Sequence, residues 1–164
     1  MLYFEDMEVG SKAKFGCYEV LRDEVISFAS QFDPQPFHLD DSAAAQTYFG
    51  KISASGWHTC AMTMRMLVQY MQGENRAGLG SPGIDEIRWR RPVYPGDALR
   101  VENEIIEKTP SKSRPDMGSY KTLVTVLNQD DTVVMTFQLI ALIRTSPLST
   151  LGRRGSRSGS NERT

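Results

Sequence analysis

Apolar and polar residues alternate with a period of two along much of the second half of the chain. This period is typical of strands, in which successive side chains point to opposite faces. In 131–144 both alternating sets are largely apolar, which predicts a central strand covered on both faces. The Asn-Gln-Asp-Asp run that precedes it predicts a hairpin with the segment before. The pattern as a whole predicts strands at 13–20, 84–91, 99–108, 119–127 and 131–144.

Two segments in the first half have helical spacing instead. The segment 22–31 ends shortly before Pro34, and proline disfavours helix at the residue that precedes it. The segment 56–72 is apolar around most of its circumference, so a helix there must be enclosed by other structure. One buried helix with five or six largely antiparallel strands predicts an α+β fold in which a sheet curls around the helix.

Segments rich in Gly, Pro and Ser separate these elements. Pro95-Gly96 predicts a type II turn, because proline presets φ and glycine accepts a positive φ. The segments 73–83 and 109–118 are predicted to be surface loops. From residue 146 onward the chain is rich in Ser, Gly and Arg, with four arginines against one glutamate, and this predicts a disordered tail at 146–164. A single domain is therefore expected at 1–145.

The composition fits a folded domain with no general affinity for polyanions. The 164 residues are 40% hydrophobic and 24% charged, with a net charge of −1, so neither nucleic acid nor a membrane is expected as a partner. The apolar-rich stretch 57–71 contains Arg65 and is too short and polar to cross a bilayer. The acidic start of the chain is unlike a secretory signal, and Cys17 and Cys60 lack the spacing of a zinc site or disulfide framework. We expect a cytoplasmic protein without a bound metal.

Asp33 and His38 are the first candidates for chemistry. They are the ends of the run Asp-Pro-Gln-Pro-Phe-His, in which two prolines stiffen a non-helical backbone. A carboxylate and an imidazole held at a fixed separation can share proton transfers, and the carboxylate can tune the pKa and tautomer of the imidazole. The same run also fits a plain turn, in which the aspartate caps backbone amides and the histidine is merely exposed.

Gly56 stands at the start of the predicted long helix, with Ser55 as a candidate N-cap. Free N–H groups and the positive end of the helix dipole meet at such a position. A residue without a side chain allows a ligand oxygen to approach the backbone, so an oxyanion could bind there without a charged side chain. The alternative is an ordinary capped helix start.

Other candidates have structural interpretations that are at least as good. His58 follows Trp57 in the first helical turn and could line the same site or simply pack. The four methionines of the helix could line an acyl pocket or fill the core. Arg88, Arg90 and Arg91 could contact phosphates, or could be solvated charges on a half-exposed strand. The sequence contains no Gly-rich nucleotide-binding loop, no nucleophile elbow and no HExxH zinc motif.

The combination of these features resembles the MaoC-like dehydratases, hot-dog-fold proteins that include (R)-specific enoyl-CoA hydratases. Their motif reads Asp-x-Asn-Pro-x-His, followed by a small-residue run that ends in Gly before the central helix. The run Arg-Pro-Val-Tyr-Pro-Gly-Asp at 91–97 is also similar to the family's Arg-Pro-Val-x-Pro-Gly-Asp turn. The resemblance covers residues 5–145. Two positions depart from it, because Gln35 stands where the family has Asn, and Ser55 stands where a His commonly precedes the glycine.

The resemblance implies an α+β hot-dog fold, in which a curved antiparallel sheet is wrapped around a long central helix. It implies an enoyl-CoA hydratase or dehydratase in which Asp33 and His38 are the catalytic pair and the Gly56 amide binds the thioester oxygen. Candidate substrate-binding residues beside them are Ser55, Gln35 and Trp57.

The resemblance also implies partners. Coenzyme A enters as part of an acyl-CoA substrate, and no separate cofactor is expected. Such proteins usually pair through their sheets, so a homodimer, or a higher oligomer built from it, is expected. Hot-dog proteins also include acyl-CoA thioesterases and non-catalytic members, so a thioesterase and an acyl-CoA-binding partner subunit remain as alternatives.

Overall fold

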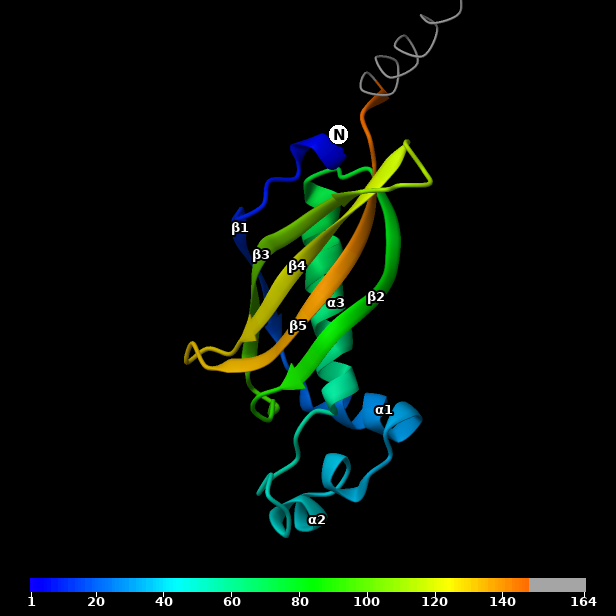
Figure 1. Ribbon diagram of the computed structural model, residues 1–164. Coiled ribbons are helices and arrows are strands. Elements are labelled where there is room, and N and C mark those ends of the chain that lie inside the picture. Colours follow the sequence, from blue (N-terminus) through cyan, green and yellow to red (C-terminus); the bar gives the residue numbers. More distant parts are fainter. Residues whose placement is uncertain (148–164) are drawn as a thin grey trace, which may run out of the picture.

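A five-stranded antiparallel sheet and one long helix make up most of the protein (Figure 1). The computed structural model describes residues 1–147, so all but the first two residues of the predicted tail at 146–164 lie outside the described residues. The strand order in the sheet is β1-β3-β4-β5-β2. The strands are β1 (Lys12–Glu19), β2 (Gly78–Trp89), β3 (Ala98–Pro110), β4 (Met117–Leu127) and β5 (Val133–Arg144).

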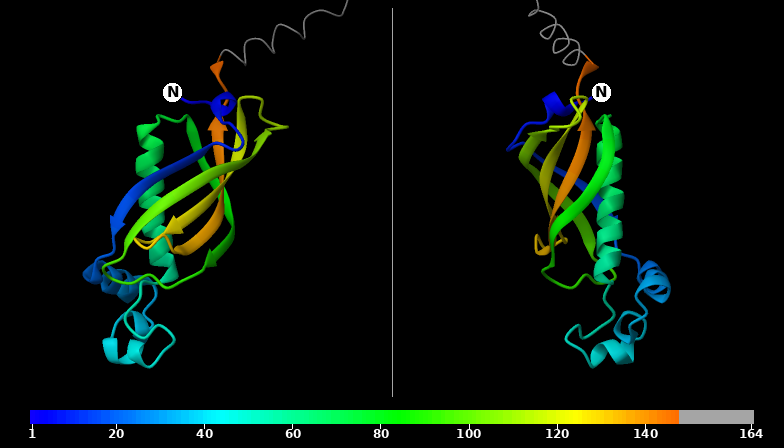
Figure 2. Two further views of the ribbon diagram at one scale, coloured as in Figure 1. Left: turned by 90° about the vertical axis from the view of Figure 1, so that its left-hand side faces the viewer. Right: turned by 45° about the vertical axis from the view of Figure 1, so that its right-hand side comes forward.

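The long helix, α3 (Gly56–Gly73), lies along one face of the sheet, which curves around it (Figure 2). Its buried residues include Met62, Met66 and Leu67, which pack with the inward side chains of β3, β4 and β5 into one core. Burial alternates along β4 with a period of two, as the sequence pattern predicts. The predicted α+β hot-dog fold is confirmed.

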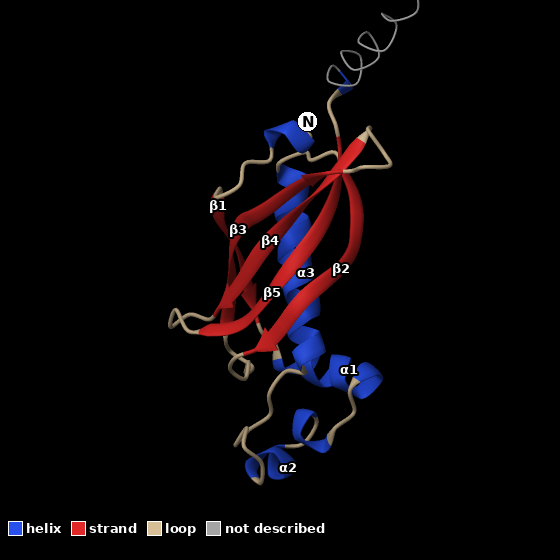
Figure 3. Cartoon of the chain, viewed as in Figure 1, coloured by secondary structure: helices blue, strands red, loops and turns tan. Residues whose placement is uncertain are grey.

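The segment between β1 and α3 lies beyond one end of the sheet (Figure 3). It contains α1 (Arg22–Phe32), the 3₁₀ turn η2 (Pro36–His38) and α2 (Asp41–Ala45). The sequence analysis predicted α1 but missed the two short elements, as well as the 3₁₀ turn η1 (Phe4–Asp6) near the N-terminus. These elements are too short for a hydrophobic period to be visible.

Both predicted loops are shorter than expected. The segment 73–83 was predicted to be a loop, yet β2 begins at Gly78 and pairs with β5 through irregular steps, including Gly80 at φ +106° opposite Leu142. Pro82 is tolerated because β2 is an edge strand and has a neighbour on one side only. The segment 109–118 is likewise shortened, because Pro110 pairs with Gly118 at the end of the β3–β4 ladder.

The turn before β3 holds the chain against the start of α3. Gly96 has φ +93° and the Asp97 N–H donates to the Tyr94 carbonyl at 3.0 Å, so the predicted turn at Pro95-Gly96 is confirmed. Just before it, the Val93 carbonyl accepts from Ala54 N–H at 2.8 Å. The residues that follow β2 are therefore joined to those that precede α3. None of the helices described within residues 1–147 is long and apolar enough to span a membrane.

Candidate active site

Asp33 and His38 are brought together by a short, rigid connection after α1. Asp33 is the residue that ends α1, and its N–H still donates to the helix at Ala29. The next turn is closed by two backbone hydrogen bonds, from Gln35 N–H to the Asp33 carbonyl at 2.7 Å and from His38 N–H to the Gln35 carbonyl at 2.9 Å. Prolines at 34 and 36 fix φ on either side of Gln35. The backbone therefore sets the separation of the two side chains.

His38 is buried, with 4% of its surface exposed, which does not fit the alternative of an exposed turn histidine. Its Nδ1 lies 2.7 Å from the carbonyl oxygen of Ser53. A carbonyl can only accept, so Nδ1 carries the proton and the neutral ring has its lone pair on Nε2. Nε2 faces Asp33 Oδ2 at 3.5 Å.

Asp33 accepts two side-chain hydrogen bonds, one on each oxygen. The Ser55 hydroxyl donates to Oδ2 at 2.7 Å, and the Gln35 side-chain amide donates to Oδ1 at 2.8 Å. The Ser55 bond is the largest cause that lowers the pKa of Asp33; the Gln35 bond and the charge of His38 add to it, and partial burial opposes it. Asp33 is therefore ionised at neutral pH.

The start of α3 meets the same carboxylate. The Ser55 side chain accepts from Trp57 N–H at 3.2 Å, so Ser55 is the N-cap that the sequence predicts, and it contacts Asp33 at the same time. Gly56 is the first residue of the helix, where an N–H group has no acceptor within the helix. The positive end of the α3 dipole and the Gly56 amide thus lie beside the Asp33–His38 pair.

Gly56 is a glycine for a reason that the sequence analysis did not anticipate. A Cβ atom at this position would lie 2.6 Å from the Trp89 ring, so the space beside the backbone is filled by indole. Trp89 Nε1–H also donates to the Gly56 carbonyl at 2.9 Å. Trp57 packs edge to face against Trp89, with ring centroids 5.4 Å apart, and more than half of its own surface is exposed.

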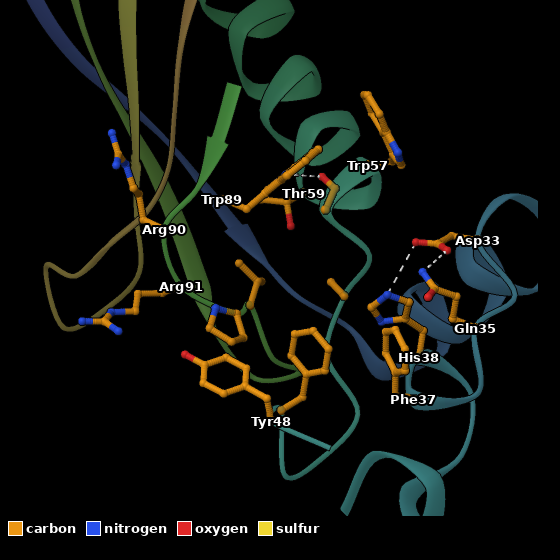
Figure 4. Close-up of a pocket in the computed structure, with 15 residues that line it drawn as sticks. Asp33, Gln35, Phe37, His38, Tyr48, Trp57, Thr59, Trp89, Arg90 and Arg91 are labelled. Atoms are coloured by element: carbon orange, nitrogen blue, oxygen red, sulfur yellow. Dashed lines mark hydrogen bonds and ion pairs between the residues drawn. The ribbon is translucent and has the colours of Figure 1, made fainter. Parts of the chain in front are cut away.

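A cavity of about 440 Å³ joins these groups (Figure 4). Of the predicted residues, Asp33, Gln35, His38, Gly56 and Trp57 line it, and Ser55 is buried behind them. The sequence analysis did not place Phe37, Tyr48, Phe49, Ala54, Thr59, Trp89 or 90–93 in the site. Thr59 could have been found, because it lies one helical turn beyond Ser55 and its hydroxyl donates to the Ser55 carbonyl.

His58 lies away from the pair. It is buried, its ring stacks on Phe28 at 4.7 Å between centroids, and it lines a separate cavity between α1 and α3. Burial lowers its pKa, and the charge of Glu24 opposes this in part. The packing interpretation of His58 is confirmed. The buried methionines Met62 and Met66 belong to the core and do not line the candidate active site.

Within residues 1–147, no three His, Cys, Asp or Glu side chains come together as metal ligands. What the site offers is a buried imidazole, an ionised carboxylate and a helix N-terminus at one edge of a largely apolar cavity. Such a set can move protons and stabilise a developing negative charge.

Comparisons with known proteins point in one direction. The family model of the MaoC-like domain matches residues 6–127. A 3-hydroxybutyryl-CoA dehydratase of Methylorubrum extorquens is 34% identical over 116 residues, which are 70% of this chain and 70% of that protein. The solved structure of a MaoC-like dehydratase from Rhodospirillum rubrum is 38% identical, with a TM-score of 0.80, over 90% of this chain and 99% of that one. A Mycobacterium tuberculosis protein with a double hot-dog fold is 19% identical, with a TM-score of 0.73, over 89% of this chain and 45% of that one, and shows the shared fold alone.

Proposed function

The chain belongs to the MaoC-like dehydratase family, and on that premise we propose that it is an enoyl-CoA hydratase or dehydratase. It adds water to a trans-2-enoyl-CoA or removes water from the 3-hydroxyacyl-CoA. The observation that carries the proposal is the pair formed by His38 Nε2 and Asp33 Oδ2, two acceptors that face each other at 3.5 Å at the edge of the cavity. The relative from Methylorubrum extorquens, by its name, acts on such a thioester.

Water is the natural occupant of a position between two acceptors, because it has two protons to donate. The neutral His38 ring presents its lone pair at Nε2, since Ser53 holds the proton on Nδ1. The hydrogen bonds to Asp33 lower its pKa, so it stays a carboxylate that accepts a hydrogen bond from the water without removing the proton. We therefore assign proton removal to His38 and orientation of the water to Asp33.

In the proposed addition, the water oxygen bonds to the β-carbon of the enoyl group while one of its protons moves to His38 Nε2. The electron pair of the double bond moves towards the thioester, whose oxygen becomes an enolate oxygen. His38 then returns the proton to the α-carbon on the same face, which restores the neutral ring. Dehydration follows the same steps in reverse.

The Gly56 amide is the proposed donor to the enolate oxygen. Among the described residues this N–H has no acceptor, and it stands at the first turn of α3, where the helix dipole also favours negative charge. Donors placed at a developing oxyanion typically contribute about 100- to 1,000-fold in rate. No step of this reaction requires a metal or a redox group, and coenzyme A enters with the substrate.

The test is loss of the ultraviolet absorbance of crotonyl-CoA, run beside an assay for free thiol. Wild type should consume absorbance without releasing thiol. Asp33→Asn and His38→Gln should each lower kcat/KM by about 100- to 10,000-fold. Asp41→Asn is the matched control, because Asp41 pairs with Arg22 on the surface and should turn over normally. Thiol release would instead indicate a thioesterase, and near-wild-type rates in both site variants would overturn the assignment.

We also propose that the active form is a homodimer joined along β2. In the described sheet β2 is an edge strand on which Leu79 and Ile84 are exposed, and Gly78 and Gly80 of β2 line a groove with Met64 and Val68 of α3. An unpaired apolar edge favours pairing with another chain, and an isologous contact between two copies closes the assembly. Light scattering should give a dimer mass for wild type.

A lysine at the centre of this edge tests the proposed interface. Ile84→Lys should give the monomer mass, because it places a charge in the contact between copies. The control is Ile106→Lys, a similarly exposed isoleucine on β3, which should remain dimeric. A monomeric wild type, or a dimeric Ile84→Lys, would overturn this interface.

A further inference from the structure

Arg90 and Arg91 directly follow β2 and line the candidate cavity on the side opposite Asp33 and His38 (Figure 4). Their backbone N–H groups both donate to the Val134 carbonyl, at 2.8 and 3.2 Å. The backbone that carries the two arginines is therefore fixed to β5, while their long side chains remain exposed.

The two guanidinium groups have no acidic partner among the described residues. Arg90 makes one long side-chain hydrogen bond, from Nε–H to the neutral Thr136 hydroxyl at 3.4 Å, and Arg91 makes none within residues 1–147. Four other arginines are paired with acids, in Arg22–Asp41, Arg76–Glu74, Arg100–Asp131 and Arg114–Asp116. Two uncompensated positive charges thus lie together at the rim of the cavity, in a chain whose net charge is −1.

We propose that Arg90 and Arg91 bind the diphosphate of coenzyme A while the acyl end of the thioester lies at Asp33 and His38. The proposal rests on the function proposed above. A guanidinium group matches phosphate oxygens in pairs of hydrogen bonds, and two adjacent guanidinium groups match two adjacent phosphates. The opposite ends of the cavity then correspond to the opposite ends of the substrate, with the uncharged pantetheine arm along the largely apolar wall between them.

A pair of substrates separates this role from catalysis. Crotonyl-CoA carries the phosphates, whereas crotonyl-pantetheine has the same reacting group and none of them. Arg90→Ala and Arg91→Ala should each raise KM for crotonyl-CoA about tenfold, as expected for loss of charged hydrogen bonds, with kcat unchanged. KM for crotonyl-pantetheine should not change. The effect on crotonyl-CoA should shrink as salt is added, because the charges are exposed.

Arg88→Ala is the matched control. Arg88 lies near the end of β2, does not line the cavity, and donates only to the Ile87 carbonyl. It should leave both KM values unchanged. An equal rise of KM for both substrates in the Arg90 and Arg91 variants, or no rise for either, would overturn the proposal.

Two further experiments identify which phosphate is bound and separate this proposal from the proposed function. With 3′-dephospho crotonyl-CoA the arginine variants should show the same rise in KM, and an effect that disappears with the 3′-phosphate would overturn the diphosphate assignment. If wild type turns over neither substrate, the proposed function fails, and titration calorimetry with coenzyme A then tests the arginines alone. Binding that is lost in the double variant but kept in Arg88→Ala supports them; equal binding by wild type and the double variant overturns them.

Discussion

The Ser55 hydroxyl donates a 2.7 Å hydrogen bond to Asp33 Oδ2 across 22 positions of sequence. The Ser55 hydroxyl oxygen also accepts the Trp57 N–H, which makes Ser55 the N-cap of α3. One small side chain therefore joins the carboxylate of the proposed catalytic pair to the start of the central helix. Because this bond is the largest cause that lowers the pKa of Asp33, Ser55 links the ionisation of the site to the geometry of the helix start.

Ser55→Ala should raise the pKa of Asp33, since the main group that stabilises its charged form is lost. Carbon-13 NMR of the Asp33 carboxyl group, followed as pH is lowered, measures this pKa directly. Loss of the N-cap should also lower the free energy of unfolding by about 1 kcal/mol. Urea unfolding measures that loss.

A second cap separates these effects. Asp40 caps α2 by accepting the Ala43 N–H at 2.8 Å and makes no hydrogen bond to Asp33. Asp40→Ala should lower stability without changing the pKa of Asp33. Ser55→Thr, which keeps the hydroxyl, should restore the wild-type pKa of Asp33. An unchanged Asp33 pKa in Ser55→Ala would show that the Ser55 hydrogen bond does not stabilise the carboxylate.

Gln35→Glu should raise the pKa of Asp33 further than Gln35→Ala does. In the alanine variant Asp33 loses one hydrogen bond that stabilises its charge. In the glutamate variant it loses that bond and gains a like charge, and each change raises its pKa. The Asp33 pKa, measured by carbon-13 NMR of its carboxyl group, should rise in the order wild type, Gln35→Ala, Gln35→Glu. Gln31→Glu is the control, because Gln31 contacts Ser27 on the surface of α1 rather than Asp33. The reverse order would contradict this electrostatic account.

Much of the fold could be predicted because burial alternates along the central strands as the side chains do. The first part of β2 could not be. Residues 78–83 contain three glycines and a proline and are largely exposed, so their local composition indicates a loop. They form a strand because β5 offers a hydrogen-bonding partner, which is a tertiary effect.

The candidate site likewise has a part that could be predicted from the sequence and a part that could not. Asp33, His38 and Gly56 lie in two short motifs near each other in sequence, so their role could be inferred from residue type and spacing. Trp89 and the arginines after it come from the far edge strand. Their position over the start of α3 depends on how the sheet curls, and no local pattern encodes that.

Gly56→Ala should destabilise the protein through Trp89. The added Cβ would lie 2.6 Å from the rigid indole ring, closer than atoms tolerate, so the ring or the helix start must move. Overpacking of this kind costs about 1 to 3 kcal/mol. The double variant Gly56→Ala/Trp89→Ala should lose less stability than the sum of the two single variants, because the clash is absent. Urea unfolding of the four proteins measures this coupling.

Gly73→Ala provides the comparison for that cycle. Gly73 ends the same helix, and a Cβ there would meet nothing within 4 Å. Alanine at Gly73 should be neutral or should stabilise by a few tenths of a kcal/mol, about the lower part of the helix propensity difference. If Gly56→Ala were equally harmless, contact with Trp89 would not be what requires glycine at the start of α3.

His58 supplies a pH dependence of stability that is separate from the active site. It is buried against Phe28, and its Nδ1 has no hydrogen-bond partner among the described residues. Burial lowers its pKa below the ordinary histidine value of 6.5, so the unfolded chain binds this proton more readily than the folded chain does. The contribution of His58 to stability is therefore complete above pH 6.5 and decreases as pH falls below it towards the lowered pKa.

His58→Phe should remove this contribution. Phenylalanine keeps the stack with Phe28 and cannot be protonated. As pH is lowered from about 7 to about 5, the free energy of unfolding should therefore fall less in the variant than in wild type. Urea titrations of the two proteins across that range measure the difference, in which contributions from Asp33 and His38 cancel because both proteins retain them. His38→Phe alters the other histidine and retains His58, so it should keep the pH dependence of stability that His58 contributes. Parallel curves for wild type and His58→Phe would mean that the folded protein accommodates a charged His58 at no cost, through Glu24 beside it.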